Sequence, residues 1–272
     1  MKHVRMASSV MAAPPSSGAA MGIIALFTFR EALRDRLIRA TLLMIGLGWV
    51  LAVFLDELLL TATESTQAAI LGFIFRLGCV FQIAILVTFA VARDLQNRGF
   101  GMILAMPFPR SVVFMGKWIG FSLAALLLAV MCGLALLPLV PLKAVALWSL
   151  VLGCELLIMA AFSFLLTLSI QQAPLALSLT AGFYLLARSM NALLLIAQQT
   201  NEMAPHWSGA TAKFMLSIIA GVLPGLDHFT VTEWLVYHTG SFNAFLPILG
   251  ETVIYLFLLI AMGLFDLYRK DF

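Results

Sequence analysis

The sequence predicts an all-α membrane protein with six transmembrane helices, an N-terminal amphipathic elbow helix, and a short re-entrant or interfacial helix between the fifth and sixth spans. Composition is the first reason: 62% of the 272 residues are hydrophobic and only 11% are charged, unlike a soluble domain. The second reason is that six apolar runs reach the length of about 20 residues that a helix needs to cross a bilayer. The third is that the basic residues gather in a few connectors, which sets the orientation of the spans.

Residues 1–21 are rich in Ala, Ser and Pro and lack the apolar core of a secretory signal. We therefore expect a mobile tail there, followed by a single transmembrane domain over residues 22–272. Residues 22–39 place apolar side chains on one helical face and charged ones on the other, which predicts the amphipathic elbow helix at the membrane interface. The alternative is that these residues are only the charged flank of the first span. The segment carries Arg30, Glu31 and Arg34.

The apolar runs lie at roughly residues 40–60, 69–91, 118–137, 146–170, 174–197 and 249–267. Basic residues stand before the first run, between the second and third, and after the last. They are Arg30, Arg34, Arg36, Arg39, Arg93, Arg98, Arg110, Lys117, Arg269 and Lys270. The positive-inside rule then makes both termini cytoplasmic in a multi-pass protein of the cell (inner) membrane. No nucleic-acid partner is expected, because a net charge of +3 forms no sustained basic face.

The outer loop between the fifth and sixth spans, residues 198–248, contains a second apolar piece. Phe214 to Leu223 is too short to cross a bilayer and ends in Pro224-Gly225. We expect a re-entrant or interfacial helix that caps the outer end of a pathway, or a loop helix that packs on the bundle for stability alone. The three loop histidines match no recognised metal-site spacing, so no metal site is predicted. The three cysteines lie in apolar runs without C-x-x-C spacing and are expected to be buried.

Three charged residues fall inside apolar runs: Arg76, Glu155 and Arg188. A charge at the bilayer centre costs about 2.5–3.5 kcal/mol on insertion scales, so each needs a partner. All three fall about two helical turns inward from the outer ends, which predicts one cluster in the outer half. It is either a gate or substrate contact, or an ion-paired clasp between helices, and we favour the clasp. Nearby polar residues line a wet cavity or form interhelical hydrogen bonds; they are Gln82, Tyr184, Asn191, Gln198 and Gln199.

The cytoplasmic connector at residues 93–117 is polar, basic and Pro-containing, between two long apolar runs. Its residues follow a definite order: Arg98-Gly99-Phe100-Gly101, Ile103-Leu104, Met106-Pro107, Pro109-Arg110, Gly116-Lys117 and then Gly120. This order resembles the corresponding loop of type-2 ABC transporter permeases, the ABC-2 type membrane-spanning subunits. The resemblance covers the whole chain, from the Phe29-Arg30-Glu31 segment to the six spans and the terminal basic residues. Phe100-Gly101 departs from the usual Gly-Thr, and Asp94 and Gln96 stand where a Glu is often found.

The resemblance implies that the connector is a coupling loop, which docks a short helix into a groove of a cytosolic ATPase. Apolar residues would anchor that helix, namely Phe100, Met102, Ile103 and Leu104. Arg93, Arg98 and Arg110 would add charge-assisted contacts. The alternative is that the basic residues only set orientation and the prolines only break the helix. The resemblance further implies an ATP-driven exporter with two ATPase copies and a second permease chain, identical or different, surrounded by membrane lipid.

Several motifs are absent from the sequence. No G-x-x-x-x-G-K-[ST] loop occurs, because Gly116-Lys117 is followed by Trp118, so ATP and Mg are expected on the partner ATPase and no cofactor is expected in this chain. H-E-x-x-H and G-x-S-x-G are also missing, which disfavours an intramembrane enzyme. The alternative function is an ion-gradient-driven secondary carrier, although the two halves show no convincing internal repeat.

Overall fold

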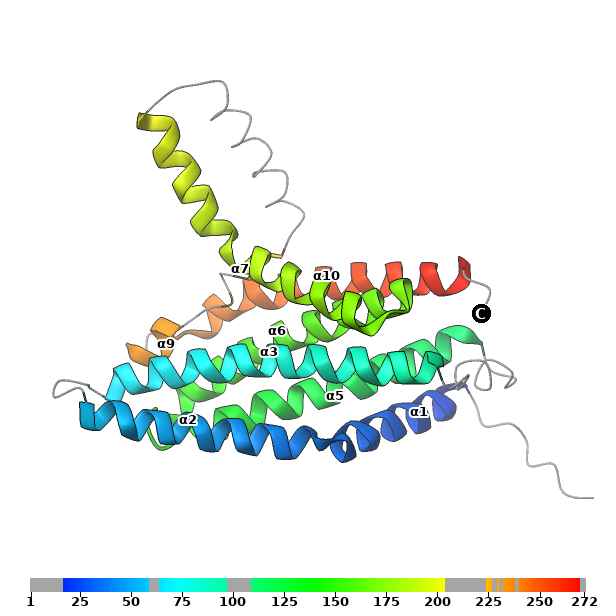
Figure 1. Cartoon of the computed structure of the whole chain (residues 1–272), viewed down its shortest axis with the longest axis horizontal. Coiled ribbons are helices and arrows are strands. Elements are labelled where there is room, and N and C mark those ends of the chain that lie inside the picture. The colour runs from blue at the N-terminus through cyan, green and yellow to red at the C-terminus, as the bar shows by residue number, and fades with distance from the viewer. Residues whose placement is uncertain are drawn as a thin grey trace, which may run out of the picture.

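The computed structural model describes residues 17–58, 64–96, 109–203, 224–226, 229, 232–237 and 240–269. Every secondary-structure element within these ranges is a helix, and the helices form an elongated bundle from which the C-terminal part of α7 projects (Figure 1). One of them, η1, is a π-helix. The elements are α1 (Ser17–Ala32), η1 (Leu33–Leu37), α2 (Ile38–Leu58), α3 (Glu64–Gln96), α5 (Arg110–Leu136), α6 (Leu142–Ile170), α7 (Ala173–Met203), α9 (Thr232–Val236) and α10 (Phe242–Arg269).

Four helices of the described residues are long and apolar enough to cross a bilayer. They are Ser65–Gln96 in α3, Arg110–Leu136 in α5, Leu142–Ile170 in α6 and Phe242–Arg269 in α10. The chain is therefore a membrane protein, and these helices match the expected second, third, fourth and sixth spans. The first expected span corresponds to α2, whose apolar stretch, Ile38–Phe54, is shorter. The fifth expected span corresponds to α7. The count of six spans stays a prediction.

Helix α6 is the centre of the bundle. Of its most apolar 18-residue segment, 78% is buried, whereas 22% of the corresponding segment of α10 is buried. Helix α6 also contacts α3, α5, α7 and α10. A helix that is apolar all round is expected at such a central position. The prediction that the cysteines are buried is confirmed: all three are free and buried, and the sulfurs of Cys79 and Cys132 lie 3.1 Å apart between α3 and α5.

The first helix differs from the expected elbow. Helix α1 begins at Ser17, so residues 17–21, expected in the mobile tail, are helical; Ala19 and Ala20 are strong helix formers. It lies along α5 and continues through η1 into α2 (Figure 1). A Cβ atom at Gly120 of α5 would be 2.8 Å from the carbonyl oxygen of Ala25. Small residues thus let α1 rest directly on α5, and an interfacial orientation of this helix is not confirmed.

The π-helix η1 joins α1 to α2 at a bend that α3 holds in place (Figure 1). The Gln82 amide of α3 donates hydrogen bonds to the Leu37 carbonyl oxygen at 2.9 Å and to the Thr41 hydroxyl oxygen at 2.8 Å. Thr41 also donates to the Leu37 carbonyl. Gln82 is therefore an interhelical hydrogen-bond donor at an irregular turn. The side chains of Asn191, Gln198 and Gln199 lie outside the described part of the chain.

The helices extend further than the apolar runs predicted. Helix α3 continues to Gln96, and α5 begins at Arg110 directly after the extended Pro109, so Arg93, Arg110 and Lys117 are helical although they were expected in a loop over 93–117. Hydropathy alone set the predicted limits, and Arg, Lys, Leu and Gln are good helix formers outside the bilayer. The outer loop expected at 198–248 shortens in the same way, because α7 reaches Met203 and α10 begins at Phe242.

Part of the outer loop enters the bundle. Pro224, Leu226 and Phe229 are buried, and α9 contacts α3 and α6. The Gly225 amide donates to the Glu251 carboxylate at 2.8 Å. Irregular backbone at membrane depth is tolerated where protein buries it and satisfies its polar groups. The expected re-entrant piece itself, Phe214 to Leu223, lies outside the described residues.

Candidate functional site

Two groups of charged side chains stand out, one in each half of the bundle. We name Arg76, Glu155 and Arg188 the intramembrane cluster. We name the hollow lined by Phe27, Arg30, Glu31, Arg34 and Arg93 the arginine cavity. We call the end of the bundle where α1 and α5 begin and α3 and α10 end the basic end (Figure 1). Arg93, which lines the cavity, lies in the last turn of α3 near this end.

The intramembrane cluster joins three helices at one carboxylate. Arg76 Nε of α3 lies 3.5 Å from Glu155 Oε2 of α6, and Arg188 Nη1 of α7 lies 3.7 Å from Glu155 Oε1. Glu155 is completely buried, and the side chains of Arg76 and Arg188 are 3% and 18% exposed. These distances are longer than hydrogen bonds, so the attraction is mainly Coulombic. The structure thus brings together the three charges that the sequence places at similar depth.

Neighbouring groups fix both guanidinium groups. Arg76 donates a hydrogen bond to the carbonyl oxygen of Phe229, in the part of the outer loop that enters the bundle. Its Cζ lies 5.7 Å from the centre of the Trp148 ring, within the range of a cation–π contact. Arg188 donates to the Tyr184 hydroxyl at 3.3 Å. The cluster therefore links α3, α6, α7 and the outer loop.

The cluster carries more positive than negative charge. Two guanidinium groups share one carboxylate, and Nη2 of Arg76 has no hydrogen-bond partner among the described residues. Removal of one partner from a buried ion pair is strongly destabilising, because it leaves an uncompensated charge in a poorly solvated place. This geometry fits the clasp expected from the sequence better than a substrate contact, since all three groups already face one another.

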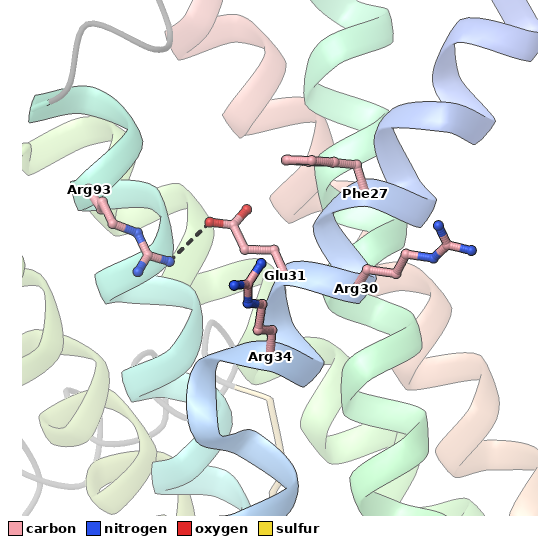
Figure 2. A pocket seen from close by; sticks show the side chains of 5 residues that line it. All are labelled: Phe27, Arg30, Glu31, Arg34 and Arg93. Atoms are coloured by element: carbon pink, nitrogen blue, oxygen red, sulfur yellow. Dashed lines mark hydrogen bonds and ion pairs between the residues drawn. The ribbon is translucent and has the colours of Figure 1, made fainter.

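The arginine cavity lies between α1 and the end of α3 and opens to solvent. Its volume is about 610 Å³. Figure 2 shows that Glu31 of α1 points toward Arg93 of α3, and the two form an ion pair of 3.1 Å. Both side chains stay accessible, Arg93 44% and Glu31 36% exposed. The structure thus joins a residue of the expected elbow to a residue of the expected coupling loop.

A second ion pair connects the neighbouring helices at the basic end. Lys117 Nζ of α5 pairs with the Asp94 carboxylate of α3. The Lys117 side chain is only 7% exposed, so this pair is largely shielded from solvent. With the Glu31–Arg93 pair and the α1–α5 contact, it connects the ends of α1, α3 and α5.

The remaining predicted docking residues fall in two groups. Arg110 is the first residue of α5. Arg98, Phe100, Met102, Ile103 and Leu104 lie outside the described residues. The helices α3 and α5 therefore define where the connector starts and ends, at Gln96 and Pro109.

Sequence reasoning missed several contributors to these sites. The Phe229 carbonyl is a backbone group of a loop, and no residue pattern signals it. Trp148 lies among the apolar residues of the fourth expected span, and nothing in the sequence indicates its contact with Arg76. Asp94 and Lys117 were assigned to one connector without a pairing, although opposite charges that flank a long connector are a usable signal once both helices are known to reach it.

No protein-family model matches the chain, and no curated protein matches it. The functional proposal therefore rests on the residues, on their geometry and on the resemblance of the connector.

Proposed function

We propose that this chain is the membrane-spanning permease subunit of an ATP-driven (ABC) transporter, acting as an exporter. It would pair with a second permease chain and with two copies of a cytosolic ATPase, which would bind ATP and Mg. The observation that carries the proposal is the linked basic end: two ion pairs join α1, α3 and α5 within the last turn of α3 and the first two turns of α5, beside the connector of residues 97–109.

The linkage suits a coupling device. A push on the connector acts on the ends of α3 and α5 together, because Asp94 and Lys117 pair across them. The Glu31–Arg93 pair and the close α1–α5 contact carry the displacement to α1. In the other half, Arg76 and Glu155 hold α3 to α6, so α3 would tilt about that point. Small shear movements of packed helices are a common route to opening a pathway.

The finer features of the proposal follow from the sequence. They are six spans, a coupling loop at 93–117 and both termini in the cytoplasm, in the cell (inner) membrane. Phe100 and Ile103 would enter the groove of the ATPase, with Arg93, Arg98 and Arg110 around them. The arrangement of the basic end supports this orientation, because α3 and α10 both end there and carry Arg93 and Arg269 in their last turns (Figure 1).

The test is co-purification. The tagged full-length chain is expressed in its native host, solubilised in a mild detergent, and examined for bound subunits and for vanadate-sensitive ATP hydrolysis. We expect an ATPase subunit in stoichiometric amount from the wild type, and its loss from a Phe100→Asp/Ile103→Asp variant that still inserts into the membrane. Charge in an apolar anchor is costly, since it must be desolvated in the groove.

A control introduces two aspartates in place of exposed hydrophobic residues at the opposite end of the bundle. Leu142 and Tyr237 are 70% and 71% exposed, and a Leu142→Asp/Tyr237→Asp variant is expected to keep the ATPase. If the Phe100→Asp/Ile103→Asp variant also keeps its ATPase, the docking assignment is wrong. If the wild type carries no ATPase in several mild detergents, the ABC proposal is wrong.

The competing proposal is an ion-gradient-driven carrier. It draws on Glu155, a fully buried carboxylate among membrane helices, because intramembrane carboxylates are common members of proton and ion pathways. Uptake or efflux by the purified chain in proteoliposomes, driven by an imposed ion gradient without ATP, would favour the carrier. The clasp geometry argues against it, since both oxygens of Glu155 face arginines.

A further inference from the structure

A segment of the outer loop is inserted deep into the bundle. We name the described residues of 224–236 the inserted segment. Leu226, Phe229 and Leu235 are each 0% exposed, and α9 lies beside α3 at the end opposite the basic end (Figure 1). The Phe229 carbonyl reaches Arg76, which is 12 residues beyond the start of α3, about 18 Å along the helix. Irregular backbone at this depth needs partners for its polar groups.

Two charged side chains of opposite sign hold the backbone of the inserted segment. Arg76 of α3 donates a hydrogen bond to the Phe229 carbonyl oxygen. The Gly225 amide donates to the Glu251 carboxylate of α10 at 2.8 Å. Hydrogen bonds to charged groups are stronger than those between neutral groups. A cation on α3 and an anion on α10 therefore fasten the segment to two different helices.

The inserted segment also covers Arg76 with an apolar side chain. Gly72 is one helical turn before Arg76, so the two residues share a face of α3. A Cβ atom at Gly72 would lie 2.9 Å from Cδ1 of Leu235 and 3.7 Å from the Trp148 ring. Arg76 Cζ lies over that same ring. The missing side chain at Gly72 thus lets Leu235 rest against α3 beside Arg76, which is only 2% exposed.

The structure of the inserted segment depends on these contacts. Helix α9 has five residues, whereas an isolated helix shorter than about 12–15 residues is marginal in water. The described residues before α9 form turns and irregular backbone. Short and irregular segments open at lower free energy than long helices, whose backbone groups are bonded within the helix. The inserted segment is therefore expected to open before α3 and α6, against which it packs.

We propose that the inserted segment is a lid that shields the intramembrane cluster from water, and that Arg76 is its latch. In the closed state, the Phe229 carbonyl pairs with Arg76 and Leu235 excludes water. When the lid opens, water has to reach Arg76, because a guanidinium group that loses a partner is unstable in apolar surroundings. Opening of the lid and hydration of the cluster are thus one event. The lid requires neither an ATPase nor transport, so it does not rest on the proposed function.

Hydrogen–deuterium exchange of the purified full-length chain in detergent tests the latch. Mass spectrometry compares the peptides that cover 224–236 with peptides of α5 and α6. Arg76→Gln should speed exchange in 224–236 about tenfold, because a hydrogen bond to a charged group is lost, and should change α6 little. The matched control, Arg188→Gln, neutralises an arginine of the same cluster that faces Glu155 and Tyr184. It should leave exchange in 224–236 nearly unchanged.

A conservative variant separates the charge of the latch from its geometry. Arg76→Lys keeps a positive charge for Glu155. Its compact ammonium lacks the guanidinium fork with which Arg76 faces Glu155 and the Phe229 carbonyl together. We therefore expect faster exchange in 224–236 from Arg76→Lys as well. Wild-type exchange rates in both Arg76→Gln and Arg76→Lys would show that Arg76 is not a latch.

A further variant opens the lid without any change of charge. Gly72→Leu places a large side chain where Leu235 rests and should displace the inserted segment. Arg76 should then react with p-hydroxyphenylglyoxal, a water-soluble reagent for guanidinium groups, and peptide mass spectrometry locates the label. The control is Gly182→Leu, because nothing lies within 4 Å of a Cβ atom at Gly182. It should leave Arg76 as unreactive as in the wild type.

The two sets of variants decide the proposal together. Faster exchange confined to 224–236 in Arg76→Gln, with labelling of Arg76 in Gly72→Leu but not in Gly182→Leu, supports it. Exchange that rises equally in 224–236, α5 and α6 of Arg76→Gln is a general loss of stability and overturns the latch. Strong labelling of Arg76 in the wild type, or none in Gly72→Leu, overturns the lid.

Discussion

The intramembrane cluster and the arginine cavity are built from the same residue types in different surroundings. Each combines one glutamate, two or three arginines and an aromatic side chain. In the cluster, Glu155 is fully buried and Arg76 is 3% exposed. In the cavity, Glu31 and Arg93 are 36% and 44% exposed. Access to water therefore decides the role: buried charges are committed to one another, and exposed charges remain available to a ligand.

The largest loss of stability is expected when the glutamate of the intramembrane cluster is removed. Glu155→Gln leaves Arg76 and Arg188 facing each other without a carboxylate, and such a loss from a buried ion pair costs about 3–5 kcal/mol. The free energy of unfolding in mixed micelles, from a titration with SDS, measures the effect. A Glu155→Gln variant as stable as the wild type would show that the cluster does not hold the helices together.

Arg188→Gln is the matched control for the cluster. It leaves Glu155 paired with Arg76 alone, so the charges are balanced one to one. Arg188 is also 18% exposed, and its loss is expected to cost clearly less than the loss of Glu155. If Arg188→Gln and Glu155→Gln lowered the free energy of unfolding equally, the explanation by charge balance would be wrong.

A smaller effect is expected where α1 rests on α5. A Cβ atom at Gly120 would lie 2.6 Å from Cβ of Thr28, so Gly120→Ala should displace α1 and cost about 1–3 kcal/mol. Gly46→Ala is the control, because nothing lies within 4 Å of a Cβ atom there; it should be neutral or slightly stabilising. The same micelle titration compares the two. Equal stability of both variants would argue against close α1–α5 packing.

The smallest effect is expected from the exposed ion pair of the cavity. Glu31→Gln removes the Glu31 carboxylate that pairs with Arg93 and should lower the free energy of unfolding by less than about 1 kcal/mol. Water and salt screen an exposed ion pair, and fixing its two long side chains costs conformational entropy. The cost should fall further in 1 M salt, where the Debye length is only about 3 Å. If Glu31→Gln lowered the free energy of unfolding as much as Glu155→Gln, the two sites would not differ in how strongly their ion pairs stabilise the fold.

The sequence predicted the fold where apolar runs alone decide it. Four expected spans are helices of sufficient length, because length and hydropathy are local properties. The packing of α1 was not predictable in this way. It depends on Gly116 and Gly120 facing α1, and a helical stripe shows which residues share a face but not which helix that face will meet. The ends of α3 and α5 were also missed, because the polar ends of a helix look like a connector.

The candidate sites were predictable to different degrees. Counting helical turns placed Arg76, Glu155 and Arg188 at one depth, since position along a span is a local quantity. The link between Glu31 and Arg93, 62 residues apart, was not predicted, and the two residues were assigned to separate features. Pairing across helices depends on their relative rotation. Periodicity leaves that rotation undetermined for any helix that contains an irregular turn.

That irregular turn is η1, and it sets the rotational register of the whole N-terminal helix. A π-turn bonds residue i to i+5 and so holds one residue more than an α-turn. Each residue of an α-helix advances the chain by about 100° around its axis. Deletion of a single residue between Leu33 and Leu37 would therefore turn α1 by about that angle relative to α2, and Glu31 would face away from Arg93. The extra residue, in a turn whose Leu37 carbonyl accepts a hydrogen bond from Gln82, thus aims Glu31 of α1 at Arg93 near the end of α3.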